Sequence, residues 1–302
     1  MTSTPIALFV YKRPHHTRKT LESLMANAEF SDSPLYVFCD GAKRKKDIPL
    51  VRETRELISS YELDNATIIE REENMGLANS IITGVTELCN KYGRVIVVED
   101  DLYLSPYFLK YMNTALDTYE EYDEVMHIAG YMFPVRGQLP DTFFYRATSC
   151  WGWGTWKRAW DKFEPDAHTL LAEFQDKNKR WEFDIRGSTK YYLMLKYQAS
   201  NSWAIRWYAS VFLNNGLCLH PGRSLVNNIG HDDSGAHCDC TNAYDVNVSE
   251  DKDIRFTTDI SESEEAVTLM VDFYRSIRKP IYVLAYNQLK RMVKNFLNDL
   301  NL

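Results

Sequence analysis

The chain has 302 residues, of which 45% are hydrophobic and 13% aromatic, enough to bury the core of one large domain without disulfides. Its formal net charge of −7 excludes the broad basic surface with which nucleic-acid-binding proteins neutralise phosphates, so we expect no nucleic-acid partner. The six cysteines are scattered, and no segment reaches the roughly 18 apolar residues of a membrane helix or resembles a signal sequence, so we expect a cytoplasmic protein.

Short apolar runs alternate with helical patterns through the first third of the chain. We predict strands at 6–11, 35–39, 66–70 and 94–98, and helices at 17–28, 52–61 and 79–91. This alternation predicts an α/β fold with a mostly parallel, buried sheet flanked by helices.

The pattern loses this regularity from about residue 130, and all seven tryptophans lie between Trp151 and Trp207. Beyond Asp259 a helical pattern runs to the end of the chain. We therefore expect a ligand-binding half over 1–130, an aromatic-rich second half of the same domain over 131–258, and a C-terminal helical tail over 259–302.

Polar segments follow each predicted strand. In open α/β sheets ligands bind beyond the carboxyl ends of the strands, so these segments should meet at one crevice. They are Tyr11-Lys12-Arg13, Asp40-Gly41, Asn74–Leu77 and Glu99-Asp100-Asp101.

Glu99, Asp100 and Asp101 place three carboxylates at the mouth of a buried strand, where uncompensated charges repel and resist desolvation. Hard cations such as Mg²⁺ or Mn²⁺ take oxygen ligands and are often held by one or two carboxylates together with substrate phosphates. The cluster therefore predicts a metal–diphosphate site. The alternative is an acidic loop that only ends a strand.

The segment VIVVEDDLYLSPYFLKYM, residues 95–112, resembles the metal-binding segment of GT-A glycosyltransferases. The closest resemblance is to the N-acetylglucosaminyltransferase I branch and its bacterial polysaccharide-assembly relatives. The resemblance implies that Asp101 holds the metal, while Glu99 and Asp100 face the ribose and base of the nucleotide.

Three further segments carry this resemblance. PIALFVYKRP implies that Arg13 contacts the donor diphosphate, and VFCDG implies that Asp40 reaches the uracil. The Asn-x-Gly-Leu turn at Asn74 and Gly76 implies a close backbone approach to the nucleotide. From the residues alone, Arg13 is equally an ordinary surface cation, and Asp40 and Gly76 are equally turn formers.

Residues 148–156 gather three tryptophans around two glycines. Aromatic rings stack on the C–H faces of sugars, and the resemblance places a Gly-Trp element of the sugar pocket here. We expect Trp151 and Trp153 to line that pocket. A purely structural core role is the alternative, and it is strongest for Trp156 and Trp160.

In the family that this chain resembles, a Trp-Asp segment supplies the catalytic base. This chain has Ala204 and Ile205 at the corresponding positions, so that carboxylate is missing. Transfer with inversion needs a carboxylate to accept the proton of the attacking hydroxyl. Asp184, between aromatic residues, is our candidate base, with Asp232 and Asp233 as further candidates.

Residues 227–237 read as a glycine-hinged loop of the kind that closes over a bound nucleotide-sugar. His237 is expected to touch the diphosphate or the metal. Zinc held by His231, His237, Cys238 and Cys240 is a weaker alternative, because the spacing Cys-x-Cys misses the usual two-residue gap.

The stretch 275–302 combines regularly spaced apolar residues with six cations against one acid, which is typical of a helix on a membrane surface. Packing onto the protein's own body is the alternative.

The sequence thus predicts a hexosyl- or N-acetylhexosaminyltransferase, inverting and dependent on Mn²⁺ or Mg²⁺. It would move a sugar from a UDP-sugar to a glycan or polyprenyl-linked acceptor in surface polysaccharide synthesis, with peripheral membrane contact through 275–302. A sugar-phosphate nucleotidyltransferase is one alternative, although Tyr11–Pro14 is not its Gly-rich phosphate loop. A non-catalytic nucleotide- or glycan-binding relative is the other.

Overall fold

The computed structural model describes residues 4–198, 202–232 and 242–278. Its centre is an eight-stranded sheet with the strand order β3-β2-β1-β4-β8-β6-β9-β7. Those strands are β1 (Ile6–Val10), β2 (Leu35–Cys39), β3 (Ala66–Glu70), β4 (Arg94–Glu99), β6 (Val125–Ala129), β7 (Thr142–Tyr145), β8 (Trp153–Trp156) and β9 (Leu217–Pro221). A separate two-stranded sheet pairs β5 (Leu102–Leu104) with β10 (Val226–Asn228).

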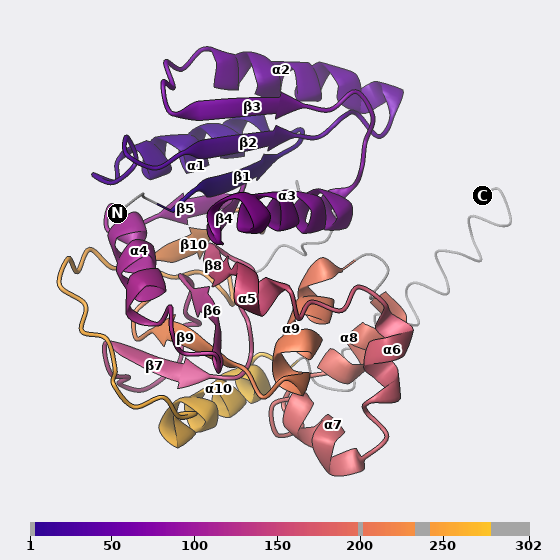
Figure 1. The fold of residues 1–302 in the computed structure, drawn as a ribbon, viewed down its shortest axis with the longest axis vertical. Helices are drawn as coiled ribbons and strands as arrows, with labels where there is room; N and C mark the ends of the chain where they lie inside the picture. The colour runs from indigo at the N-terminus through magenta and orange to yellow at the C-terminus, as the bar shows by residue number, and fades with distance from the viewer. Residues whose placement is uncertain (1–3, 199–201, 233–241, 279–302) are drawn as a thin grey trace, which may run out of the picture.

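Helices flank the sheet, and a further group of helices forms much of the lower part of the molecule (Figure 1). They are α1 (Pro14–Met25), α2 (Ile48–Ser59), α3 (Leu77–Tyr92), α4 (Phe108–Thr118), α5 (Lys157–Trp160), α6 (Ala167–Ala172), α7 (Lys177–Phe183), α8 (Tyr191–Gln198), α9 (Trp203–Leu213) and α10 (Glu264–Ser276), with a 3₁₀ turn η1 (Lys45–Asp47).

The first third of the chain forms the predicted βαβ series. β2 pairs parallel to β1 and β3, and β1 pairs parallel to β4, with α1, α2 and α3 as the crossovers. The predicted α/β fold, with a mostly parallel sheet flanked by helices, is confirmed. The helices begin a few residues earlier than predicted, since Pro14 occupies the first turn of α1 and fixes a helical φ there.

The two faces of β1 belong to different cores, because successive side chains of a strand point to opposite sides. Ile6 and Leu8 pack with residues of α1 and α4, whereas Ala7 and Phe9 pack with residues of α3 and α9. The parallel strands are therefore buried on both sides, which explains their unbroken apolar sequences.

The second half of the sheet is mixed. β8 lies antiparallel between β4 and β6, β9 is parallel to β6, and β7 closes the edge antiparallel to β9. Because β4 and β8 share one ladder, the sheet continues from the first half of the chain into the second.

The C-terminal segment begins with α10, whose start is capped by Ser263 through a hydrogen bond from the backbone N–H of Ala266. The predicted membrane-surface helix over 275–302 lies almost wholly outside the described residues. Among the described helices, none has the length and apolar composition that crossing a membrane requires.

Candidate active site

The carboxylates of Glu99, Asp100 and Asp101 lie where β4 ends, next to the end of β1. The backbone N–H of Tyr11, which follows β1, donates to Asp100 Oδ2 at 3.2 Å. Thr20 on α1 fixes the turn beyond β4, because its hydroxyl donates to the carbonyl of Asp100 and accepts from the N–H of Leu102. The carboxyl ends of the two central parallel strands thus meet at this cluster, as the sequence predicted.

Arg13 provides the counter-charge. Its Nη1 lies 2.7 Å from Asp101 Oδ2 and 3.7 Å from Asp100 Oδ1. All three side chains are largely buried, with 13–14% of each exposed. Arg13, predicted to contact the diphosphate, and Asp101, predicted to hold the metal, therefore lie together, and Arg13 is not an ordinary surface cation.

A strand from late in the chain completes the cluster. β10 pairs antiparallel with β5, so that Asn228 lies opposite Leu102. The next residues then reach Asp101: the N–H of Ile229 donates to its carbonyl at 2.8 Å, and Gly230 packs against its carboxylate. A Cβ on Gly230 would lie only 2.3 Å from Asp101 Oδ2, so this approach requires glycine.

Asp40, Asn74 and Gly76 form a second part of the site. Asp40 is buried and accepts hydrogen bonds from Asn74 Nδ2 and from the backbone N–H groups of Gly41, Met75 and Gly76. Gly76 has a φ of +76° and precedes α3, a conformation that favours glycine. Asp40 therefore holds the turn after β3 against the end of β2, and the structure brings these three predicted residues together.

His231 is a polar residue next to Gly230 that the sequence placed in the predicted loop over 227–237 and in the zinc alternative, without a further role. It directly follows Gly230, and its ring lies 5.4 Å from that of Trp151 and 5.5 Å from that of Tyr244 between centroids. Both ring nitrogens are buried and have no hydrogen-bond partner among the described residues. The sequence signal was its position directly after Gly230, which lies two residues beyond the short strand β10.

The electrostatics of the cluster favour an added cation. Burial and repulsion from Asp101 raise the pKa of Asp100 to about 7, against the attraction of Arg13. Burial and repulsion from both aspartates raise the pKa of Glu99 well above its usual range. One guanidinium thus does not fully stabilise three ionised carboxylates, whereas a divalent ion would favour their ionised form, and their oxygen atoms are a donor set that suits Mg²⁺ or Mn²⁺.

No three His, Cys, Asp or Glu side chains within 4–198, 202–232 and 242–278 converge on a point suited to a metal ion. Asp101 instead bonds to Arg13. The carboxylate oxygens match a divalent ion in chemistry, and the assignment of Asp101 as its ligand stays a prediction.

Two of the predicted site residues lie elsewhere. Trp153 on β8 is fully buried, because its ring packs against Trp203 and Trp207 of α9 on that face of the sheet, and it also stacks on His127. It belongs to the core and does not line a sugar pocket. Trp151, by contrast, is partly exposed and packs edge-on against Tyr131 at a centroid distance of 4.5 Å.

Asp184 does not lie at the cluster either. It ends α7, and its carboxylate accepts from the N–H of Tyr192 at 2.7 Å, which holds the connection to α8. In Figure 1, α7 lies at the bottom of the molecule, well separated from β4. The prediction of Asp184 as catalytic base is therefore wrong.

Of the remaining candidates, Asp232 follows His231 and lies 3.1 Å from His16 Nε2 on α1. Asp233, His237, Cys238 and Cys240 lie outside the described residues, so the predicted contact of His237 and the zinc alternative stay untested.

Comparisons with known proteins give distant likenesses only. No protein-family model matches the chain, and no curated protein matches it. Solved structures that resemble it include GalNAc-T7 with UDP, GalNAc and Mn²⁺, at a TM-score of 0.46 and 9% identity, over 74% of this chain and 43% of that one. The chain thus spans less than half of GalNAc-T7.

Two further likenesses cover more of the other chain. The mannosyltransferase PcManGT from Pyrobaculum calidifontis, in complex with GDP-Man and Mn²⁺, has a TM-score of 0.37 and 11% identity, over 70% of this chain and 73% of that one. A UDP-glucose pyrophosphorylase with UDP-glucose has a TM-score of 0.36 and 12% identity, over 72% and 90%. With identities this low, these likenesses assign no activity to the chain.

Proposed function

We propose that this protein is a GT-A glycosyltransferase that moves a hexosyl or N-acetylhexosaminyl unit from a UDP-sugar to a glycan or lipid-linked acceptor. Surface polysaccharide synthesis is the proposed setting. The observation that carries the proposal is the cluster at the ends of β1 and β4, where Asp100 and Asp101 face Arg13. A buried cluster of one arginine and several carboxylates, at the edge of the sheet where the parallel strands end, suits a diphosphate accompanied by a divalent ion.

In the proposed site Arg13 pairs with the diphosphate, and Asp101 holds Mn²⁺ or Mg²⁺. Such an ion, when bound, offsets the charge that develops on the departing nucleoside diphosphate. Glu99 and Asp100 face the nucleoside, and the turn held by Asp40 lets Asn74 and Gly76 approach it. His231, which follows Gly230 and whose buried ring nitrogens have no partner among the described residues, is proposed to bond to the diphosphate or the metal.

The second half of the chain would hold the sugar and the acceptor. Trp151 offers a partly exposed ring next to His231. Asp232 replaces Asp184 as the proposed base, because it follows His231 and its side chain is 50% exposed. Donor binding is then assigned to 1–130 and acceptor binding to 131–258, with 275–302 as the proposed contact with the inner face of the membrane.

The nucleotidyltransferase alternative is less favoured, because the chain passes from β1 directly into α1 at Pro14 without a glycine-rich loop. The non-catalytic alternative rests on Ala204 and Ile205, which begin α9 in place of a carboxylate. One assay separates these functions.

The purified protein is incubated with a panel of UDP-sugars and Mn²⁺, with and without EDTA, and the release of UDP is measured. We expect release with at least one donor, even as slow hydrolysis, and its loss with EDTA. Metal-dependent binding of every donor without release would indicate the non-catalytic function. Formation of pyrophosphate from UTP and a sugar 1-phosphate would indicate the nucleotidyltransferase.

A further inference from the structure

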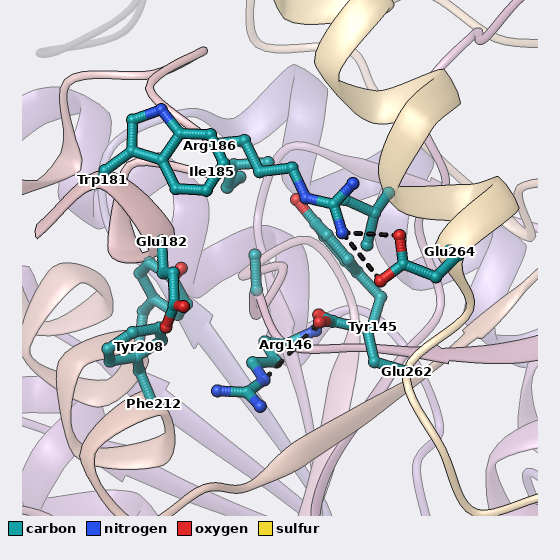
Figure 2. A pocket seen from close by; sticks show the side chains of 12 residues that line it. Tyr145, Arg146, Trp181, Glu182, Ile185, Arg186, Tyr208, Phe212, Glu262 and Glu264 are labelled. Carbon is teal, nitrogen blue, oxygen red and sulfur yellow. Dashed lines mark hydrogen bonds and ion pairs between the residues drawn. The ribbon is translucent and has the colours of Figure 1, made fainter. Parts of the chain in front are cut away.

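A cavity of about 370 Å³ lies among helices of the lower half of the molecule (Figure 2). We call it the α7–α10 pocket. Its walls come from the end of β7, from α7 and the loop after it, from α9, and from the start of α10. Side chains that line it include Trp181, Arg186, Tyr208, Phe212, Arg146 and Glu262.

This pocket is separate from the candidate active site. None of its lining residues belongs to the carboxylate cluster or to the turns around it. Figure 1 shows α7 and α10 at the lower end of the molecule, apart from β1, β2 and β3. A ligand bound here would therefore leave the nucleotide site free.

Most of the charges in the pocket are already paired. Arg186 Nη2 lies 2.7 Å from Glu264 Oε1 and 2.6 Å from its Oε2, and Arg146 Nε lies 3.6 Å from Glu262 Oε2 (Figure 2). Because each guanidinium has a carboxylate partner, a phosphate would find no uncompensated cation among the described lining residues. Paired groups of this kind still donate hydrogen bonds to, and accept them from, neutral hydroxyls.

Aromatic side chains provide the apolar part of the pocket. Tyr208 and Phe212 are almost fully buried, whereas Trp181 is 52% exposed. Figure 2 shows Trp181 and Arg186 on one side of the cavity, with Tyr208, Phe212 and Arg146 on the other. An indole face next to paired polar groups suits the mixed C–H and hydroxyl surface of a pyranose ring.

Two further features indicate a binding site. The Tyr145 side chain is 3% exposed, and its hydroxyl has no hydrogen-bond partner among the described residues. The loop beside it holds three consecutive residues with positive φ: Ile185 at 47°, Arg186 at 52° and Gly187 at 68°. Such conformations are unfavourable for isoleucine and arginine, and strain of this kind is concentrated at functional sites.

We propose that the α7–α10 pocket binds a neutral sugar residue of a glycan acceptor. The indole of Trp181 stacks on the sugar, and the paired groups on both sides, together with the hydroxyl of Tyr145, bond to the sugar hydroxyls. Sugar binding as such is independent of the transfer reaction, but the role of the glycan as acceptor rests on the function proposed above.

The first test is an array of neutral oligosaccharides of glucose, galactose, mannose and N-acetylhexosamines, with sialylated and phosphorylated counterparts. Wild type is compared with Trp181→Ala, Tyr145→Phe and Asp101→Asn. We expect wild type and Asp101→Asn to bind the same neutral glycans. Trp181→Ala should bind at least tenfold more weakly, and Tyr145→Phe roughly fivefold more weakly with an unchanged or raised melting temperature.

Tyr145→Phe keeps the test independent of folding, because it removes a buried hydroxyl that has no partner. Titration of the best glycan and of its isolated monosaccharides then separates a glycan site from a site for free sugar. Three results would overturn the proposal: no binding by wild type, equal binding by Trp181→Ala, or tighter binding of a free monosaccharide than of the glycan. If the wild type bound neutral glycans but did not bind UDP, that result would count against the proposed function, and the proposed glycan site would stand.

Discussion

Gly230 offers the sharpest perturbation of the proposed metal–diphosphate site. A Cβ added to this residue would lie 2.3 Å from Asp101 Oδ2 and 2.9 Å from its Cβ and Cγ. The carboxylate would have to move by about 1 Å to restore ordinary van der Waals contact. Arg13 Nη1 holds that same oxygen at 2.7 Å, so the movement would also disturb the ion pair.

The expected size of the effect follows from this displacement. A catalytic group misplaced by about 1 Å costs on the order of 100-fold in rate, whereas the added methyl group costs about 1–3 kcal/mol of folding free energy. We expect Gly230→Ala to remain folded, with UDP release reduced about 100-fold. UDP release is measured with Mn²⁺ at saturating donor, and folding by thermal melting.

Gly137→Ala is the matched control. There the added Cβ would lie 2.7 Å from Leu269 Cδ2, the end of a flexible side chain on α10, so a similar clash arises away from the site. The control should keep wild-type activity. If Gly230→Ala released UDP as fast as wild type, the assignment of Asp101 to the reacting site would be refuted.

Three other outcomes are expected. Arg13→Gln leaves Asp100 and Asp101 uncompensated, so the free energy of unfolding in urea should fall by about 3 kcal/mol, and Mn²⁺ should recover part of it; equal stability with and without Mn²⁺ would contradict the proposed metal site. Asp184→Asn should lower stability by about 1 kcal/mol and leave UDP release unchanged, and lost activity would restore Asp184 as the base. Burial lowers the pKa of His220 from 6.5 to about 4, so below pH 6.5 the unfolded chain takes up a proton that the native state does not bind. The stability difference between wild type and His220→Gln should therefore fall by about 1.4 kcal/mol per pH unit between pH 6 and 4.5. The comparison with the variant is needed because the raised pKa of Asp100 acts in the opposite direction in both proteins. If the stability difference between the two proteins stayed constant over this pH range, native His220 would be protonated there, and the lowered pKa would be refuted.

The parallel half of the fold could be predicted because its signals are local. Apolar runs such as Arg94–Val98 are long enough to identify buried strands, and each one ends at a polar residue. Since the carboxyl ends of parallel strands share one edge, the meeting of Arg13 with Asp101 followed from the sequence.

The rest of the site depends on contacts between distant segments. β10 has only three residues, and its pairing with β5 brings Gly230 to Asp101 from more than 100 positions away in the chain. No local pattern encodes that pairing. The sequence therefore predicted a loop over 227–237 but not that the backbone at Ile229 and Gly230 would pack against Asp101.

The tryptophans show a different limit. Trp151 and Trp153 are separated by one glycine, and composition alone could not distinguish them. In the structure the strand β8 begins at Trp153, so that its ring points onto a sheet face covered by α9, while Trp151 precedes the strand and stays partly exposed. The position of one strand boundary thus decided which ring is available to a ligand.

The most direct test of the metal–diphosphate site is calorimetric titration of UDP into the wild type and Asp101→Asn, each with and without Mn²⁺. Asp117→Asn is the matched control, because it also removes a carboxylate paired with an arginine, Arg94, at a site on α4. We predict Mn²⁺-dependent UDP binding in the wild type and in Asp117→Asn, and its loss in Asp101→Asn. Equal UDP binding by wild type and Asp101→Asn, or wild-type binding that is unaffected by Mn²⁺, would contradict the proposed site.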